Sequence, residues 1–170
     1  MGHAIDAPPP GPSEIPDDVR TSLCWLLTRA SYVLETKLTA ALEALGIPPR
    51  SHYVLTTAMT GEHTQIELAR LIGLDKTTMV VVLDELEAAG LAERRPSKTD
   101  RRARVIHVTK AGERLLRKGD ELIHEVYDEV LAPLAPRERQ AFLDSLGKLV
   151  HGSLAEPAEC AQPVRRRRAA

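Results

Sequence analysis

The sequence has little of what secreted and membrane proteins usually need. Of its 170 residues only two are cysteines and none is asparagine, which excludes a disulfide framework and N-glycosylation. No apolar run approaches the roughly 20 residues that span a bilayer. The amino end is proline-rich and acidic, unlike a signal or transit peptide. We therefore expect a cytoplasmic protein with no membrane partner.

Motifs for catalysis, metal binding and base stacking are also missing. There is no glycine-rich phosphate loop, no HExxH and no GxSxG. The six histidines include no pair spaced three or four residues apart, and there is no CxxC, so we expect no metal site and no cofactor. The few aromatic residues lie outside the basic segment described below, which argues against RNA or single-strand binding. An enzyme is not expected.

Two short capped helices are predicted between residues 64 and 90. Thr64 and Glu67 have the spacing of a capping box, and Gly73 is suited to end that first helix. Only Leu74 separates Gly73 from the next cap, Asp75. The turn between the two helices is therefore tight.

The second helix has an inward and an outward face. The inward stripe recurs at helical spacing and consists of Met79, Leu83 and Leu86, with Gly90 ending the run. Thr77, Thr78 and Val81 lie outward near the start, where a recognition helix faces the major groove of DNA. The valine run has two interpretations. It packs, which suits Val80 and Val82 better than Val81, or Val81 and the threonine methyls contact thymine C5-methyl groups.

A cationic hairpin follows the second helix. Leu91 to Arg95 and Ala103 to Val108 are predicted as short strands around a turn that contains Pro96 and Asp100. From residue 93 to 118 there are ten Lys or Arg and three acids, whereas the whole chain has a net charge of −1. Such segregation indicates a surface for a polyanion, since phosphate contacts release counterions. The alternative is a solvated charged face.

A long helix is expected before this region. Leucines and alanines at helical spacing predict a helix that is capped at Asp17 and runs to Gly46, ahead of a break at Pro48 and Pro49. A second helix follows over about 51–59.

Two more helices are expected after the hairpin. Thr109 caps a long one that ends before Pro133, and Pro136 starts the last. The first and last helices carry more apolar surface than so small a domain needs alone.

The segment LDKTTMVVVLDELEAAGLAERRPSKTDRRARVIHVTKAG closely resembles the MarR family of bacterial transcriptional regulators. The wing pattern D-x-R occurs at Asp100 and Arg102, and the closing V-T-x-x-G at Val108, Thr109 and Gly112. The resemblance extends over about residues 18–150. It implies a mainly α fold: a winged helix-turn-helix DNA-binding lobe with a short antiparallel β-hairpin wing, plus N- and C-terminal dimerisation helices.

The same resemblance implies a function and a domain plan. The family acts as homodimers that bind pseudo-palindromic duplex DNA, as repressors or activators, and are released by a small ligand or by oxidation. The predicted parts are a disordered Pro-rich arm (1–16), a MarR-like domain (17–152) and a disordered basic tail (153–170). Within the domain we expect dimerisation helices at 17–46 and 110–152 and the winged helix-turn-helix at 51–109, its wing about 91–108. The arginines at 165–168 either add non-specific DNA affinity or form a solvated end.

DNA-contacting roles are carried over from the family. Arg102 would enter the minor groove with Asp100 holding its guanidinium, and other wing cations would bind phosphates. Gln65 and Lys76, at the two helix starts, would contact backbone or base edges. The predicted set is Gln65, Lys76, Thr77, Thr78, Val81, Arg94, Arg95, Lys98, Asp100, Arg101, Arg102 and Arg104.

The sequence indicates the effector less clearly than it indicates the DNA contacts. A pocket for an anionic aromatic ligand would be lined by Trp25, Arg29, His52 and Tyr53, each of which has a structural role as its alternative.

Redox switching is a second possibility. Cys24 stands where hydroperoxide-sensing members of the family keep a reactive cysteine. Leu38 and Pro49 replace the tyrosines that support that cysteine, and Cys160 is a poor resolving partner, so a buried structural cysteine is favoured. The three hypotheses are a ligand-released repressor, a regulator switched through Cys24, and a winged-helix module that binds protein.

Overall fold

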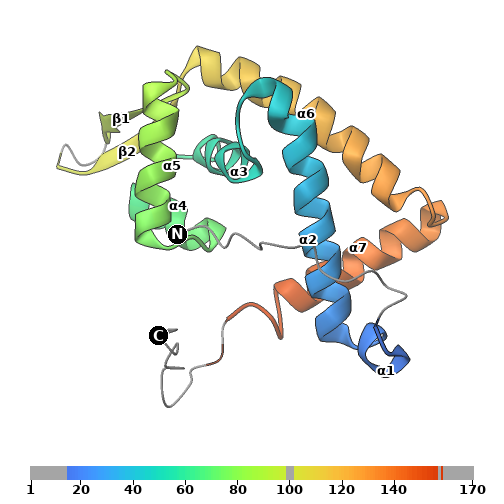
Figure 1. Cartoon of the computed structure of the whole chain (residues 1–170). Coiled ribbons are helices and arrows are strands. Elements are labelled where there is room, and N and C mark those ends of the chain that lie inside the picture. The colour runs from blue at the N-terminus through green and yellow to red at the C-terminus, as the bar shows by residue number, and fades with distance from the viewer. Residues whose placement is uncertain (1–14, 99–101, 157, 159–170) are drawn as a thin grey trace, which may run out of the picture. The chain divides into compact units, whose positions relative to one another are not determined.

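The computed structural model describes residues 15–98, 102–156 and 158 (Figure 1). The wing-tip residues Asp100 and Arg101, Cys160 and the arginine tail lie outside these residues, as does nearly all of the predicted arm. The described elements are α1 (Asp17–Arg20), α2 (Leu23–Leu42), the 3₁₀ helix η2 (Glu43–Leu45), α3 (Pro49–Ala58), α4 (Gln65–Ile72), α5 (Lys76–Ala88), β1 (Ala92–Pro96), β2 (Arg104–Val108), α6 (Lys110–Leu131) and α7 (Pro136–Val150).

The fold is mainly helical with one two-stranded antiparallel hairpin, which confirms the predicted fold class. The chain divides into two compact units, one through Asp128 and one from Glu129. Among the described helices none combines the length and apolarity needed to cross a bilayer.

The predicted single helix from Asp17 to Gly46 is wrong at its amino end. The chain leaves the helix after α1, and Ser22 is extended, with its hydroxyl accepting the Trp25 amide at 3.4 Å. Serine favours such a cap because its side chain competes for backbone N–H groups. The leucine spacing continues across this break and so hides it. At the other end Gly46 closes η2 at φ +70°, as expected for a glycine.

The predicted start of the next helix at residue 51 is also wrong. Pro48 is extended and Pro49 is already in the first turn of α3. A proline is tolerated there because the first helical amides have no partner within the helix. The pair of prolines that marks the break therefore also begins the helix.

The main core of the first unit lies among α3, α4, α5, the hairpin and the start of α6. Five side chains of α4 and α5 in this core have at most 2% of their surface exposed: Leu68, Met79, Val82, Leu83 and Leu86. A smaller cluster packs α2 on α6 through Leu38, Leu42, Ile123 and Val126. The inward stripe predicted for α5 is thus confirmed.

The second unit contains α7. The carboxylate of Glu138 accepts the Ala135 amide at 2.8 Å and closes the first turn. No residue of α7 is buried, and Phe142 and Leu143 are about half exposed. The helix therefore keeps an apolar face uncovered in the single chain.

Candidate nucleic-acid interface

The first helix of the motif, α4, is capped as its sequence predicts. The Glu67 amide donates to the Thr64 hydroxyl at 3.3 Å, and the Thr64 amide donates to the Glu67 carboxylate at 2.7 Å. The Thr64 amide and the Thr64 hydroxyl, which donates to the same carboxylate at 2.8 Å, together hold the pKa of Glu67 below its usual range. Gly73 closes the helix at φ +78°. The tight turn that orients α5 is set by these local contacts.

Asp75 caps the recognition helix α5. Its carboxylate accepts the Thr78 amide at 2.9 Å and the Thr78 hydroxyl at 2.6 Å, and both bonds lower the pKa of Asp75. Thr78 is half-buried. Its hydroxyl donor therefore serves the cap, although we predicted Thr78 as a DNA contact.

The outward face of α5 is now defined. Lys76, Thr77, Val80 and Val81 are exposed, the two valines by 39% and 48%, whereas Val82 is 1% exposed. The packing interpretation is confirmed for Val82 and is wrong for Val80. The face that a DNA groove would meet is largely aliphatic.

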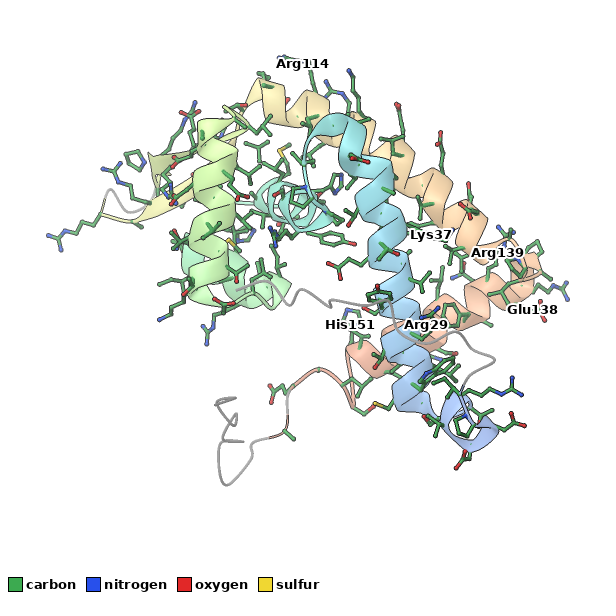
Figure 2. All side chains as sticks on the ribbon, viewed as in Figure 1. Arg29, Lys37, Arg114, Glu138, Arg139 and His151 are labelled. Atoms are coloured by element: carbon green, nitrogen blue, oxygen red, sulfur yellow. The ribbon has the colours of Figure 1, made fainter. Side chains whose placement is uncertain are left out.

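The wing pairs β1 with β2 in the register from Ala92 opposite Val108 to Pro96 opposite Arg104, each strand within one residue of its prediction. The Ile106 amide donates to the carbonyl oxygen of His63 at 2.9 Å, and Thr64 bridges to Val105. Strand β2 of the wing is therefore joined at Val105 and Ile106 to the segment before α4. In Figure 2 nitrogen-bearing side chains project from the wing, away from the helices.

Glu62 binds the two residues that follow β1. Its carboxylate accepts the Ser97 hydroxyl at 2.8 Å and the Lys98 amide at 3.3 Å, and Ser97 is only 7% exposed. We did not predict Glu62, because no local pattern connects it to a wing some 35 residues later. Its position makes it a positioning residue for the wing cations.

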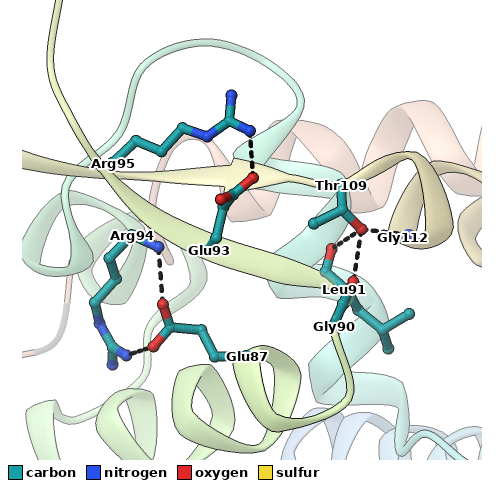
Figure 3. Close-up of polar contacts among 8 residues, drawn as sticks. All are labelled: Glu87, Gly90, Leu91, Glu93, Arg94, Arg95, Thr109 and Gly112. Carbon is teal, nitrogen blue, oxygen red and sulfur yellow. Dashed lines mark hydrogen bonds and ion pairs between the residues drawn. The ribbon is translucent and has the colours of Figure 1, made fainter.

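Arg94 braces the wing against α5. Its guanidinium pairs with Glu87, and its amide donates to Glu87 at 2.8 Å (Figure 3). The guanidinium also pairs with Asp84 at 2.8 Å. We predicted Arg94 as a DNA contact, but the structure places it among acids of the recognition helix. Arg95 pairs with Glu93, and both side chains are largely exposed.

The closing V-T-x-x-G pattern has a packing explanation. The Thr109 hydroxyl donates to the carbonyl of Gly90 at 2.7 Å and accepts the Gly112 amide at 3.1 Å (Figure 3). A Cβ at Gly112 would lie 2.2 Å from the carbonyl oxygen of Leu91. Only glycine permits α6 to start this close to β1.

The remaining predicted contacts are exposed or partly exposed. Lys98, Arg102 and Arg104 lie on the surface of the wing, and Gln65 is half-buried at the start of α4. The wing-tip partners Asp100 and Arg101 fall outside the described residues.

None of the four predicted ligand residues lines the open groove on α2 that the structure describes. Trp25 and Arg29 lie on α2, with Arg29 labelled in Figure 2, whereas His52 and Tyr53 lie on α3 with ring centroids 6.4 Å apart. An open groove of about 770 Å³ between α2 and the start of α3 has other walls. It is lined by Tyr32, Glu35, Thr36, Thr39, Ala40, Glu43, Gly46, Ile47 and Pro48.

His52 and Tyr53 have distinct surroundings. His52 is 4% exposed and packs on Gly119, where a Cβ would lie 2.6 Å from the ring. Its Nε2 is 3.1 Å from an Asp120 carboxylate oxygen, within ion-pair distance but without hydrogen-bond angles. Burial, with Tyr127 and Glu35 nearby, raises the pKa of Tyr53 to about 12. His52 therefore has a packing role between α3 and α6.

Cys24 is exposed near the start of α2, so its interpretation as a buried structural cysteine is wrong. Its thiol is open to solvent in the single chain. The exposure fits a reactive thiol.

Comparison with known proteins shows what this geometry is similar to. A model of the MarR family matches residues 45–103, which contain the helix-turn-helix and the first strand of the wing. The MarR family protein RV2887 of Mycobacterium tuberculosis, in complex with salicylic acid, is 28% identical; the match covers 76% of this chain and 96% of that one, with a TM-score of 0.65.

Two structures of CouR share the fold. The transcriptional repressor CouR bound to a 23-mer DNA duplex is 24% identical, and the match covers 79% of this chain and 96% of that one, with a TM-score of 0.73. CouR from Rhodococcus jostii RHA1 bound to p-coumaroyl-CoA is also 24% identical, with 85% and 99% covered and a TM-score of 0.72. The winged helix-turn-helix of this chain therefore matches the MarR family of transcriptional regulators over residues 45–103, and the chain shares the fold of that family's solved structures.

Proposed function

We propose that the chain is a homodimeric repressor that binds a pseudo-palindromic duplex operator and is released by a small effector. The observation that carries the proposal is a capped, outward-facing α5 joined directly to a cationic hairpin. A major groove accepts such a helix, and adjacent phosphates attract the wing. The similar fold of CouR, a repressor bound to a DNA duplex, supports this reading.

Dimerisation is supported by uncovered apolar faces in each unit. In the first unit Leu23 and Leu26, on α2, are 60% and 48% exposed, and in the second Phe142 and Leu143 are similarly exposed. Contiguous apolar patches of this kind mark association sites. A two-fold axis would place two copies of α5 about 34 Å apart, one turn of DNA.

We divide the wing residues between those that contact DNA and one that supports the wing. We assign Arg102 to the minor groove, with Asp100 as its partner, and Arg95, Lys98, Arg101 and Arg104 to phosphates. We assign Arg94 to the brace instead, since Asp84 and Glu87 already occupy its guanidinium.

The effector is proposed to be an anionic aromatic compound. Relatives are bound to salicylic acid and to p-coumaroyl-CoA. The groove on α2 contains Glu35 and Glu43, which repel a carboxylate, so Trp25 and Arg29 are better contacts for it. Tyr53, which stays neutral at physiological pH, would donate a hydrogen bond.

A salt titration tests DNA binding. Affinity for a duplex should fall steeply as salt rises, and the double substitution Arg101→Ala, Arg102→Ala should weaken binding and flatten that slope. A double variant that binds like wild type would remove the wing assignment. Binding that is insensitive to salt would favour the third hypothesis, a winged-helix module that binds protein.

A redox switch is the second candidate function, because Cys24 is exposed. Attack of its thiolate on a hydroperoxide would form a sulfenic acid and release an alcohol. Hydroperoxide should then release DNA from wild type and leave Cys24→Ser bound. Equal release from both proteins would exclude Cys24 as the sensor.

A further inference from the structure

The first two turns of α5 expose few groups that can hydrogen-bond to a base. The Thr78 hydroxyl donates to Asp75, so Lys76 and Thr77 are the exposed polar side chains there. Beside them Val80 and Val81 are 39% and 48% exposed. This surface therefore offers few side chains that could recognise a base by hydrogen bonds alone.

The second half of α5 is unsuited to DNA. Asp84 and Glu85 are exposed and Glu87 is half-buried, and acids repel phosphates. Arg94 neutralises two of these acids from the wing. The half of the helix that can enter a groove is the half that carries the valines.

Local preference does not explain the valines. Consecutive β-branched residues lower helix propensity because their χ1 rotamers are restricted. Burial accounts for Val82, which is 1% exposed, but not for Val80 or Val81. Their apolar surface faces outward at the start of the recognition helix.

Resting on the proposed function, we propose that Val80 and Val81 determine sequence specificity by contacting thymine C5-methyl groups in the major groove. Thymine alone among the four bases presents a methyl group there, and small apolar side chains contact it. Lys76 on the same helix and the exposed wing cations Lys98 and Arg104 supply the phosphate contacts that hold the helix against the duplex.

The test removes the methyl group and nothing else. A duplex that the protein selects from a random pool is remade with deoxyuridine in place of each thymidine in turn, and both forms are titrated at one salt concentration. Wild type should bind about fourfold more weakly for each contacted methyl that is lost, the value for one buried methyl-sized group.

Variants without the valine methyl groups assign the effect to the valines. Val80→Ser, Val81→Ser removes both methyl groups of each side chain, whereas threonine would keep one that can still contact thymine, so the ratio of the deoxyuridine to the thymidine dissociation constant should fall toward one. Val19→Ser on α1 is a matched control, since Val19 is 42% exposed and lies outside the helix-turn-helix. Its ratio should equal that of wild type. The ratio is insensitive to changes in folding or dimerisation, which affect both duplexes alike.

The outcomes separate this inference from the proposed function. Specific binding with no thymidine preference at any position overturns the methyl contact and leaves a DNA-binding regulator. A double variant that retains the wild-type ratio overturns the assignment to Val80 and Val81. A wild-type protein that selects no duplex overturns the proposed function and the inference with it.

Discussion

The winged helix-turn-helix and the outer helices α1, α2 and α7 differ in how completely the single chain buries their side chains. From α4 to β2 the helix starts are capped by side chains and the inward residues are buried almost completely. No residue of α1 or α7 is buried, and on α2 only Leu38 and Leu42 are. The first region buries its apolar side chains within one chain, whereas the outer helices expose surfaces that suit association with a second chain.

The two regions of the molecule therefore suit different parts of the proposed function. Local caps and a packed core fix the orientation of α5 and the wing, which rigidly presents the DNA-binding face. The exposed helices leave room for the association and effector binding expected of a regulator. Substitutions in the two regions should therefore change different measured quantities.

The largest effect on stability should come from the core of the motif. Leu83→Ala removes a side chain that is 1% exposed and leaves a cavity, so the free energy of unfolding should fall by about 2 to 5 kcal/mol. Leu26→Ala, at a side chain that is 48% exposed, should change it by less than about 1 kcal/mol in a monomeric state. Urea denaturation measures both. Equal losses would erase the contrast between the regions.

A charge on α7 should break association instead. Phe142→Glu should weaken the dimer by roughly 2 kcal/mol or more, the usual scale for an aromatic anchor, with little change in helicity. Sedimentation equilibrium measures the monomer fraction. Lys148→Glu introduces the same residue on the opposite side of the helix and should leave the dimer intact. If Phe142→Glu stays dimeric, this face is not the interface.

The two wing arginines should separate binding from bracing. Arg102→Ala should reduce operator affinity by about 1 to 3 kcal/mol and relax preference for A·T pairs. Arg94→Ala should chiefly lower thermal stability, because it leaves Asp84 and Glu87 without their shared partner. Fluorescence anisotropy and thermal melts of both variants distinguish the roles. The assignments are reversed if Arg94→Ala lowers the salt dependence and Arg102→Ala does not.

Loss of the Glu62 hydrogen bonds to the wing should have a smaller effect on operator affinity. Glu62→Ala removes the carboxylate that accepts the Ser97 hydroxyl and the Lys98 amide, so operator affinity should fall by about 0.5 to 1.5 kcal/mol, the net value of a hydrogen bond. Glu62→Gln retains an acceptor oxygen and should recover part of this loss. A gain in affinity for both variants would mean that the acid merely repels DNA.

The smallest effect is a dependence on acid pH. The pKa values of Glu67 and Asp75 are lowered in the folded state, so their caps stabilise it above the unfolded pKa values and lose that effect as pH falls below about 4. Glu67→Gln, Asp75→Asn carries caps that cannot titrate. Its stability should therefore decline less steeply than that of wild type in acid denaturation followed by circular dichroism. Parallel declines would contradict the assignment.

Features set by neighbouring residues were predictable from the sequence. The caps at Thr64 and Asp75 and the left-handed Gly73 follow from contacts within three or four residues. The break at Ser22 was missed because leucine periodicity continues through it. The start of α3 at Pro49 was missed because a proline both ends and begins helices.

Features set by distant residues were not predictable. Glu62 meets Ser97 and Arg94 meets Asp84 only because the hairpin folds back on the helices. At the candidate site, the segregated charge predicted a cationic wing. It did not show which wing cation pairs with the acids of α5. The exposure of Val80 depended on how α5 turns against the core.

Selection of bound sequences from random duplex DNA is the sharpest test of operator recognition by α5 and the wing. An inverted repeat with A·T-rich flanks, its half-site centres about one helical turn apart, should be enriched, and the enriched duplex should be lost when an anionic aromatic effector is added. Recovery of no common sequence, with binding that is insensitive to salt, would rule out a sequence-specific repressor.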